Sequence, residues 1–327
     1  MSHYSPVVAA LVTMLLTIII LISKFGKEIQ DIPNERSLHE TPIPRIGGVA
    51  MMAGILSGWA LMLTSLVWWL VLPLLGLFVV SLLDDMHSLP VKKRLLAQLV
   101  AAAVLVAGSG LFAQHGLLIT LLVLLLTIWM TNLYNFMDGS DGLAGGMALF
   151  GFSFYGIAAL MGHNDTFAML NFTIGAAALG FLYNNFHPAK VFMGDAGSIP
   201  LGFLAAAMGL WGWLQGYWPT WFPLLVFSPF IVDASVTLVK RTLRGAKITE
   251  AHREHYYQHA VQMGWGHRNV AFAEYALMLA AGGTGLACIQ QSWPGYLLLV
   301  WAGIYTILML MLDFSWKKRR SRLDSIE

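Results

Sequence analysis

Charge is the scarcest property of this sequence. Only 11% of its 327 residues are Asp, Glu, Lys or Arg, whereas 57% are hydrophobic, and soluble domains carry roughly 25% charged residues. Cysteine is almost absent too, because Cys288 stands alone, which excludes an intrachain disulfide and a cysteine-ligated metal site. We find no internal repeat and no low-complexity tract. These absences predict an integral membrane protein whose partner is the lipid bilayer and not a nucleic acid.

Long apolar runs fill most of the chain. Since a membrane-spanning helix needs roughly 20 mostly apolar residues, the sequence predicts an all-α polytopic bundle of about 11 transmembrane helices. The first run lacks a basic segment before it and a cleavage site after it, so we expect a retained helix and not a signal peptide. One integral-membrane domain, residues 1–327, is the simplest organisation. The spans are expected near 6–23, 45–64, 66–83, 95–113, 116–134, 142–161, 166–183, 197–214, 220–238, 269–289 and 294–314, with Pro73, Pro223 and Pro229 kinking the two spans that contain them.

The basic residues predict the orientation of this bundle. An odd number of spans places the two termini on opposite sides of the membrane. All 19 lysines and arginines then fall within, or directly beside, the segments on the carboxy-terminal side. Because cytoplasmic loops carry the excess of Lys and Arg, we expect the amino terminus outside and the carboxy terminus in the cytoplasm. The cytoplasmic segments are 24–44, 84–94, 135–141, 184–196, 239–268 and 315–327.

Acidic residues gather near the inner ends of the expected spans. Transporters and flippases tend to keep ionisable groups near the bilayer midplane, and none lies there in this sequence. An enzyme that joins a soluble substrate to a lipid headgroup at the cytoplasmic surface is therefore favoured over a transporter or flippase. A catalytically inactive scaffold is a further alternative. The acidic residues are Asp84, Asp85, Asp138, Asp141, Asp195, Asp233 and Asp313, with Glu274 in the first turns of its helix.

Asp84 and Asp85 end the third expected helix, in SLLDDMHSLP. Carboxylates at a helix carboxy terminus oppose the macrodipole, so capping does not explain the pair. Binding Mg²⁺, or acting as a base toward a phosphate, would explain it, and a solvated charge pair is the alternative. Lys92, Lys93 and Arg94 open the next helix. Positive-inside charge accounts for two of them, and contact with a phosphate is the other interpretation.

Two polar loops add candidate oxygen ligands. In TNLYNFMDGSDGLAGG (131–146), Asn132, Asn135, Asp138 and Asp141 recur every third residue, which would align them on one helical face if the helix continued. Capping of the following helix by one of them is the alternative. In NNFHPAKVFMGDAGS, Asp195 either joins the same cytoplasmic site or caps its own helix.

Histidines mark the longest cytoplasmic segment, which contains AHREHYYQHAVQMGWGH. His252, His255 and His259 are spaced i, i+3 and i+7, which predicts one face of a helix with Arg253 beside them. Zinc binding is one interpretation, although no Cys or carboxylate is spaced as a typical partner. A His/Arg cluster that grips a diphosphate is favoured, and a solvated surface is the alternative.

Together these motifs resemble the polyprenyl-phosphate N-acetylhexosamine-1-phosphate transferase family. The resemblance implies a polytopic enzyme of the bacterial cytoplasmic membrane in which undecaprenyl phosphate attacks a UDP-activated N-acetyl sugar, with Mg²⁺ bound, and UMP leaves. Mn²⁺ is a candidate substitute for Mg²⁺, and a homodimer is a candidate assembly. The motifs are PNERSLHETPIPRIGGVAM (33–51), LLDDMHSLPVKKRLLAQ (82–98), TNLYNFMDGSDGLAGG (131–146), NFHPAKVFMGDAGS (185–198) and HREHYYQ (252–258).

The resemblance also implies roles for individual residues. Asp195 and Asn135 match positions that hold Mg²⁺, and one of Asp84 and Asp85 is expected to handle the lipid phosphate. Arg94 matches a basic position near the phosphates. Residues expected to line the nucleotide pocket are Asp138, Asp141 and Asn185, further substrate-binding candidates are Asn132 and Lys93, and the diphosphate is assigned to His252, Arg253 and His255.

One motif departs from the family pattern. Tyr256 and Tyr257 stand where relatives often carry adjacent histidines. This difference argues against the peptidoglycan enzyme and favours the branch that primes O-antigen or capsule synthesis. The candidate donors are UDP-N-acetylfucosamine and UDP-N-acetylquinovosamine, with UDP-N-acetylglucosamine as the alternative.

Overall fold

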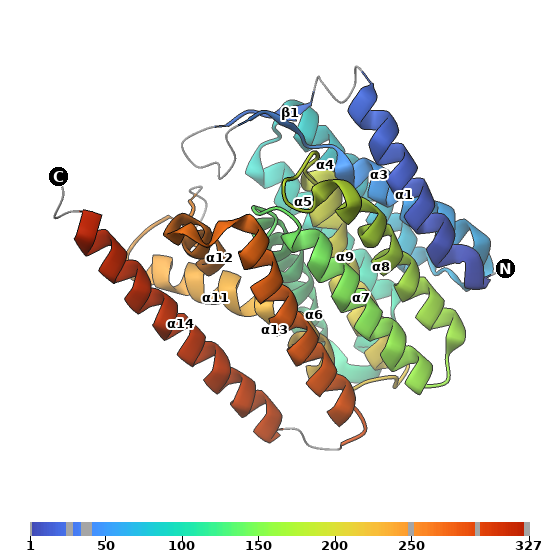
Figure 1. Cartoon of the computed structure of the whole chain (residues 1–327). Helices are drawn as coiled ribbons and strands as arrows, with labels where there is room; N and C mark the ends of the chain where they lie inside the picture. Colours follow the sequence, from blue (N-terminus) through green and yellow to red (C-terminus); the bar gives the residue numbers. More distant parts are fainter. Residues whose placement is uncertain (1, 24–28, 34–40, 248–251, 292–294, 324–327) are drawn as a thin grey trace.

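The structure, a computed structural model, describes all residues except 1, 24–28, 34–40, 248–251, 292–294 and 324–327 (Figure 1). Part of the first motif, 34–40, therefore lies outside the described residues. Almost all of the described chain is helical. Its strands are β1 (Gln30–Asp31) and β2 (Ile43–Pro44), which form a short antiparallel hairpin. The expected all-α polytopic fold is confirmed.

Long helices make up the bundle and short ones connect it. The amino-terminal half contains η1 (Ser2–Tyr4), α1 (Ser5–Ile22), α3 (Gly47–Trp59), η2 (Ala60–Ser65), α4 (Trp68–His87), α5 (Val91–Gly108), α6 (Leu111–Phe136) and α7 (Leu143–Met161). The carboxy-terminal half contains α8 (Asp165–Asn185), α9 (Asp195–Leu214), α10 (Trp221–Val226), α11 (Ser228–Leu243), α12 (Tyr256–Ala260), the π-helical turn η3 (Val261–Trp265), α13 (Gly266–Cys288) and α14 (Gly295–Leu323).

Nine helices of the described chain are long and apolar enough to cross a membrane. Two expected spans are not among them. The span 95–113 corresponds to α5, which begins four residues earlier and so includes three basic residues in its first turn. The span 220–238 is divided into α10 and α11, because Pro229 fits the first turn of a helix but not its interior. The count of eleven spans stays a prediction.

The turn between the fourth and fifth expected spans is placed differently from the prediction. It lies at Ser109 and Gly110 and not at 114–116, because Gly110 adopts a left-handed φ of 73° there. Gly116, with φ 75°, makes a kink inside α6 instead. The beginning of α1 and the end of α14 lie at opposite ends of the bundle, in agreement with an odd number of crossings (Figure 1). Which end faces the cytoplasm stays a prediction.

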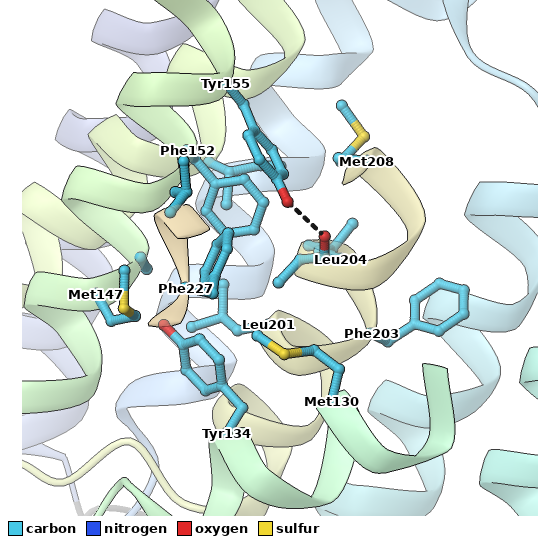
Figure 2. Close-up of a cluster of buried hydrophobic side chains, with 14 of the residues drawn as sticks. Met130, Tyr134, Met147, Phe152, Tyr155, Leu201, Phe203, Leu204, Met208 and Phe227 are labelled. Atoms are coloured by element: carbon cyan, nitrogen blue, oxygen red, sulfur yellow. Dashed lines mark hydrogen bonds between the residues drawn. The ribbon is translucent and has the colours of Figure 1, made fainter. Parts of the chain in front are cut away.

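The centre of the core lies between α6, α7 and α9, where aromatic side chains pack together (Figure 2). A hydroxyl buried in such surroundings needs a hydrogen-bond partner. Tyr155 donates to the carbonyl of Ala205 at 3.2 Å, and Tyr134 donates to the carbonyl of Ala144 at 2.7 Å. These bonds fix α7 against both α9 and α6, whose ends carry the polar residues described below.

The contact between α3 and α9 depends on glycine. A Cβ at Gly48 would lie 2.3 Å from the backbone nitrogen of Gly197, so the two backbones meet where no side chain fits. The amides of Gly47 and Gly48 donate to the carbonyls of Phe192 and Met193 at 2.9 and 2.8 Å. The motif PIPRIGG thus fixes the loop that leads into α9, and with it the position of Asp195.

Candidate active site

A small polar cavity of about 60 Å³ lies where the ends of α4 and α6 meet the beginnings of α5 and α9. Three stretches that are far apart in the sequence, 77–98, 132–136 and 195–199, contribute to it. Its charged and amide side chains are Asp84, Arg94, Gln98, Asn132, Asn135 and Asp195. Four of the eight residues that the sequence assigned to catalysis and metal binding, Asp84, Arg94, Asn135 and Asp195, are therefore brought together.

Arg94 bridges two of these carboxylates. Its Nη1 lies 2.9 Å from Oδ2 of Asp84 and 3.5 Å from Oδ2 of Asp195. Asn135 approaches Asp195 from α6 and donates from Nδ2 to its Oδ1 at 2.8 Å and to the hydroxyl of Ser198 at 2.9 Å. Because Asp195 is the first residue of α9, its charge also interacts favourably with the helix dipole.

Asp85 differs from its neighbour in what it contacts. Its two carboxylate oxygens accept the backbone N–H groups of Asp195 and Ala196 at 3.1 and 2.8 Å, and its own carbonyl accepts a hydrogen bond from Arg45 at 2.7 Å. Gly194 permits this approach, since it has φ 70° and a Cβ there would lie 2.9 Å from Oδ2 of Asp85. Asp85 therefore ties α4 to the beginning of α9, while Asp84 lines the cavity.

The donor set suits Mg²⁺, which prefers oxygen ligands and is usually held by one or two carboxylates together with substrate phosphates and water. Asp84 and Asp195 supply carboxylates. Asn135 uses its amide nitrogen within the protein, which leaves the amide oxygen as the atom suited to a cation. No group of three or more His, Cys, Asp or Glu among the described residues could hold an ion by itself. A cation here would need phosphate oxygens to complete its coordination.

The polar residues of the loop after α6 do not share one helical face, contrary to the prediction. Because α6 ends at Phe136, Asn132 and Asn135 lie on the helix, whereas Asp138 and Asp141 lie beyond it. Burial, together with the charges of Asp195 and Asp85, raises the pKa of Asp138 well above its usual range. Asp138 is not among the residues that line the cavity, so its expected contact with the nucleotide stays a prediction.

Asp141 and Asn185 connect the two polar loops. Asp141 accepts hydrogen bonds from His187 at 2.7 Å and from the amide of Ala189 at 3.1 Å. Asn185 accepts from the amide of Gly142 at 3.0 Å and donates to the carbonyl of Val191 at 2.9 Å. Both side chains have a structural role in these contacts, and their expected contact with a nucleotide stays a prediction.

The histidine motif does not form one helical face, so that prediction is wrong. Helix α12 begins only at Tyr256, which leaves His252 and His255 before it, while His259 stacks on Trp316 of α14 at 4.1 Å. His255 is 3% exposed. Burial, with the charges of His255 and Arg241, lowers the pKa of His252 to about 4, so that His252 is neutral near pH 7. Arg253 is exposed beside them.

Comparison with known proteins shows the family of this chain. The sequence model of glycosyl transferase family 4 matches residues 67–212, which include Asp84, Arg94, Asn135 and Asp195. A decaprenyl-phosphate N-acetylglucosaminephosphotransferase of Mycobacterium tuberculosis is 31% identical over 74% of this chain and 71% of its own length. The chain belongs to glycosyl transferase family 4.

Two further relatives show the breadth of family 4. A probable undecaprenyl-phosphate N-acetylglucosaminyl 1-phosphate transferase of Bacillus subtilis is 28% identical over 83% of this chain and 82% of its own length. A phospho-N-acetylmuramoyl-pentapeptide-transferase of Lactobacillus johnsonii is 28% identical over 73% of this chain and 82% of its own length. The similarity therefore extends over most of the chain.

Sequence reasoning missed three residues of this family 4 site. Gln98 exchanges two hydrogen bonds, at 2.6 and 3.2 Å, with Asn132, which was predicted to bind substrate. Ser198 supports Asn135, and Arg45 supports Asp85. Gln98, Ser198 and Arg45 all lie inside the quoted motifs, so position in a motif was the available signal. Lys93, in contrast, is exposed on the first turn of α5 and does not line the cavity.

A second cavity of this family 4 protein, about 470 Å³ in volume, is mainly apolar. It lies between α6, α9, α10 and α11. Its lining follows α6 from Leu133, two residues before Asn135, to His115 near the other end of that helix. The break between α10 and α11 contributes Phe227 and Ile231.

Proposed function

We propose that this protein transfers an N-acetylated sugar 1-phosphate from a UDP-sugar to undecaprenyl phosphate, with release of UMP. The product would prime O-antigen, capsule or a related polysaccharide at the cytoplasmic face of the bacterial cytoplasmic membrane. The names of the two relatives from Bacillus subtilis and Mycobacterium tuberculosis, which describe polyprenyl-phosphate sugar phosphotransferases, support the reaction class. The observation that carries the proposal is the convergence of Asp84, Arg94, Asn135 and Asp195 on one cavity.

The reaction exchanges one phosphoanhydride bond for another. A phosphate oxygen of the lipid attacks the β-phosphorus of the UDP-sugar and forms a new P–O bond. The bond between that phosphorus and the oxygen that bridges to the α-phosphate breaks, and the bridging oxygen leaves with UMP. Because little covalent chemistry falls to the protein in such reactions, positioning and charge neutralisation are what its side chains must provide.

The cavity residues divide these tasks. Asp84 lines the cavity, and for this reason we assign it, and not Asp85, to orient the lipid phosphate and to take its proton. The guanidinium of Arg94, which contacts Asp84 in the structure, would neutralise phosphate charge, and its planar fork of N–H groups can donate to two phosphate oxygens at once. Asp195 and Asn135 would hold Mg²⁺, which would supply charge neutralisation on the phosphate oxygens. His252, Arg253 and His255 are assigned to the diphosphate from the side of α12.

The apolar cavity suits the prenyl tail of the lipid substrate. A polyprenyl phosphate needs a polar site for its headgroup and an apolar surface beside it for its chain. The lining of the second cavity begins at Leu133, within one helical turn of Asn135 in the polar cavity. A lipid headgroup at Asp84 and Arg94 would leave its tail free to follow α6 toward His115.

The identity of the sugar is the finer part of the proposal. The HREHYYQ motif favours UDP-N-acetylfucosamine or UDP-N-acetylquinovosamine as the donor. The names of two relatives, which contain N-acetylglucosamine, favour UDP-N-acetylglucosamine. The muramoyl-pentapeptide nucleotide is disfavoured because Tyr256 and Tyr257 replace adjacent histidines. All four donors therefore belong in one panel.

The test is UMP release by purified protein in detergent with undecaprenyl phosphate, Mg²⁺ and each UDP-sugar of the panel. We expect UMP and a lipid-linked sugar diphosphate in equal amounts with at least one donor. Asp195→Asn should abolish the release. Asp165→Asn, an exposed acidic residue at the opposite end of α8 from the site, is the matched control and should react like the wild type. A flippase or an inactive scaffold releases no UMP with any donor, and that result would refute the proposal.

A further inference from the structure

Asp233 is a buried carboxylate that the proposed mechanism does not use. It lies in α11, which Figure 1 shows beside α12, and it is 4% exposed. A carboxylate in such surroundings is costly unless hydrogen bonds satisfy its oxygens. Four donors do so here, and three of them belong to the sequence His255–Tyr257.

The contacts of Asp233 define where α12 begins. Its Oδ1 accepts the amide of Tyr256 at 2.9 Å, and its Oδ2 accepts the amide of Tyr257 at 3.0 Å. Oδ1 also accepts the hydroxyl of Thr237 at 3.1 Å and lies 3.3 Å from Nδ1 of His255. One side chain therefore fixes both the backbone on which His255 lies and the imidazole itself.

We propose that Asp233 is the positioning residue of His255: it orients the imidazole by accepting a hydrogen bond from Nδ1 and so presents Nε2 to the diphosphate. A carboxylate oxygen can only accept, so a hydrogen bond across this 3.3 Å contact requires a proton on Nδ1. The capping contact from the backbone N–H of Gln258 to the His255 side chain requires an unprotonated ring nitrogen, so the two contacts compete for the tautomer. When one ring nitrogen of a histidine contacts a substrate, a hydrogen-bond partner on the other ring nitrogen, here Nδ1, is a common way to fix the tautomer. The role of His255 in this inference rests on the proposed function.

The surroundings of His255 connect it to the polar cavity. Its ring stacks on Phe136 at a centroid distance of 6.2 Å, and Phe136 both lines the cavity and follows Asn135 directly. Tyr257 donates its hydroxyl to the carbonyl of Phe136 at 3.1 Å. The ring of His252 lies 5.0 Å from that of His255 on another side. A rotation of the His255 imidazole would therefore disturb its stacking on Phe136 at the end of α6.

The decisive variant is Asp233→Asn, which keeps the size of the side chain. The amide retains one acceptor oxygen but cannot accept from Tyr256, Tyr257 and His255 together, and its NH₂ group can donate to Nδ1 and so favour the wrong tautomer. We expect kcat for UMP release to fall about 10- to 100-fold, as for second-sphere partners of functional histidines. Thr237→Val is the matched control, because it removes a partner of Asp233 without touching His255, and it should keep kcat within about threefold.

A double-mutant cycle separates positioning from a purely structural role. If Asp233 acts through His255, Asp233→Asn should lower kcat by less than about threefold in a His255→Gln background. Equal fold losses in both backgrounds would show that Asp233 only supports α12, and would overturn the proposal.

A second measurement does not depend on the folding of the Asp233→Asn variant or on the reaction. In ¹⁵N spectra of histidine-labelled wild-type protein, with His255→Gln to assign the signal, Nδ1 of His255 should carry a proton. A neutral ring protonated only on Nε2 would overturn the inference even if UMP is released. Absence of UMP from the wild type would instead refute the proposed function and leave this result standing.

Discussion

Asp85→Asn separates the two members of the aspartate pair. In the structure the Asp85 carboxylate accepts the amides of Asp195 and Ala196 at 3.1 and 2.8 Å and is 5% exposed. An asparagine of the same size can accept only one of these N–H groups, and its own NH₂ then faces the other. The substitution therefore leaves a buried donor without a partner and removes the negative charge from the beginning of α9.

The expected loss of stability follows from these two effects. A hydrogen bond to a charged group contributes about 1.5–3 kcal/mol, and a charge at a helix amino terminus contributes about 0.3–1 kcal/mol. Together they predict a decrease of roughly 2–4 kcal/mol in the free energy of unfolding. Since Asp195 is the first residue of α9, a displacement of about 1 Å there should also lower turnover about 100-fold.

Asp195→Asn is the comparison that makes this prediction sharp. Asp195 is 26% exposed on its side chain and shares the cavity with Asp84, so neutralising it relieves repulsion between like charges, which offsets the loss of its 3.5 Å contact with Arg94 and of its interaction with the helix dipole. We expect it to lose activity with unchanged or higher thermal stability, measured by tryptophan fluorescence in detergent. Asp85→Asn with the unfolding temperature of the wild type, or a larger stability loss in Asp195→Asn, would refute the division of roles between the two aspartates.

Two further predictions concern packing and pH. Gly48→Ala places a Cβ 2.3 Å from the backbone nitrogen of Gly197, so it should destabilise the protein by about 1–3 kcal/mol, whereas Gly76→Ala, which meets nothing within 4 Å, should not. His252 has a folded pKa of about 4 against 6.5 in an unfolded chain, so the unfolded state binds more protons between these values and stability falls as the pH falls through that window. His252→Gln should reduce the drop in unfolding temperature between pH 7 and pH 5, and an equal drop in both proteins would contradict the assignment.

The convergence of the site could be predicted because it depends on topology. Once the apolar runs and the basic residues had oriented the spans, Asp84, Asn135 and Asp195 had to lie at the same end of the bundle. Span length and charge asymmetry are properties of the chain itself, and they do not depend on how the helices pack. A disturbance at Pro229 could be predicted for the same reason, since proline acts on its own helix, although the expected kink is in fact a break between α10 and α11.

The roles of neighbouring residues could not be predicted in this way. Asp84 and Asp85 are adjacent, and consecutive positions on a helix point in different directions. Which of them meets the cavity and which meets α9 depends on where α9 packs, and that contact is set by Gly48 and Gly197 from other segments. Local spacing gives no access to such long-range contacts.

The failed prediction of a histidine face has the same origin, and it reveals a principle of the site. Asp85 on α4 and Asp233 on α11 are both buried carboxylates. Each accepts the first two backbone N–H groups of a different helix, α9 for Asp85 and α12 for Asp233. The helix that each one begins carries a proposed site residue at its start: Asp195 on α9, and His255 directly before α12. A carboxylate can accept several N–H groups at once, and its charge strengthens each of these hydrogen bonds. It therefore fixes a helix start more tightly than a neutral cap does. In both places a buried negative charge holds a residue that the proposed mechanism assigns to the metal or to the diphosphate.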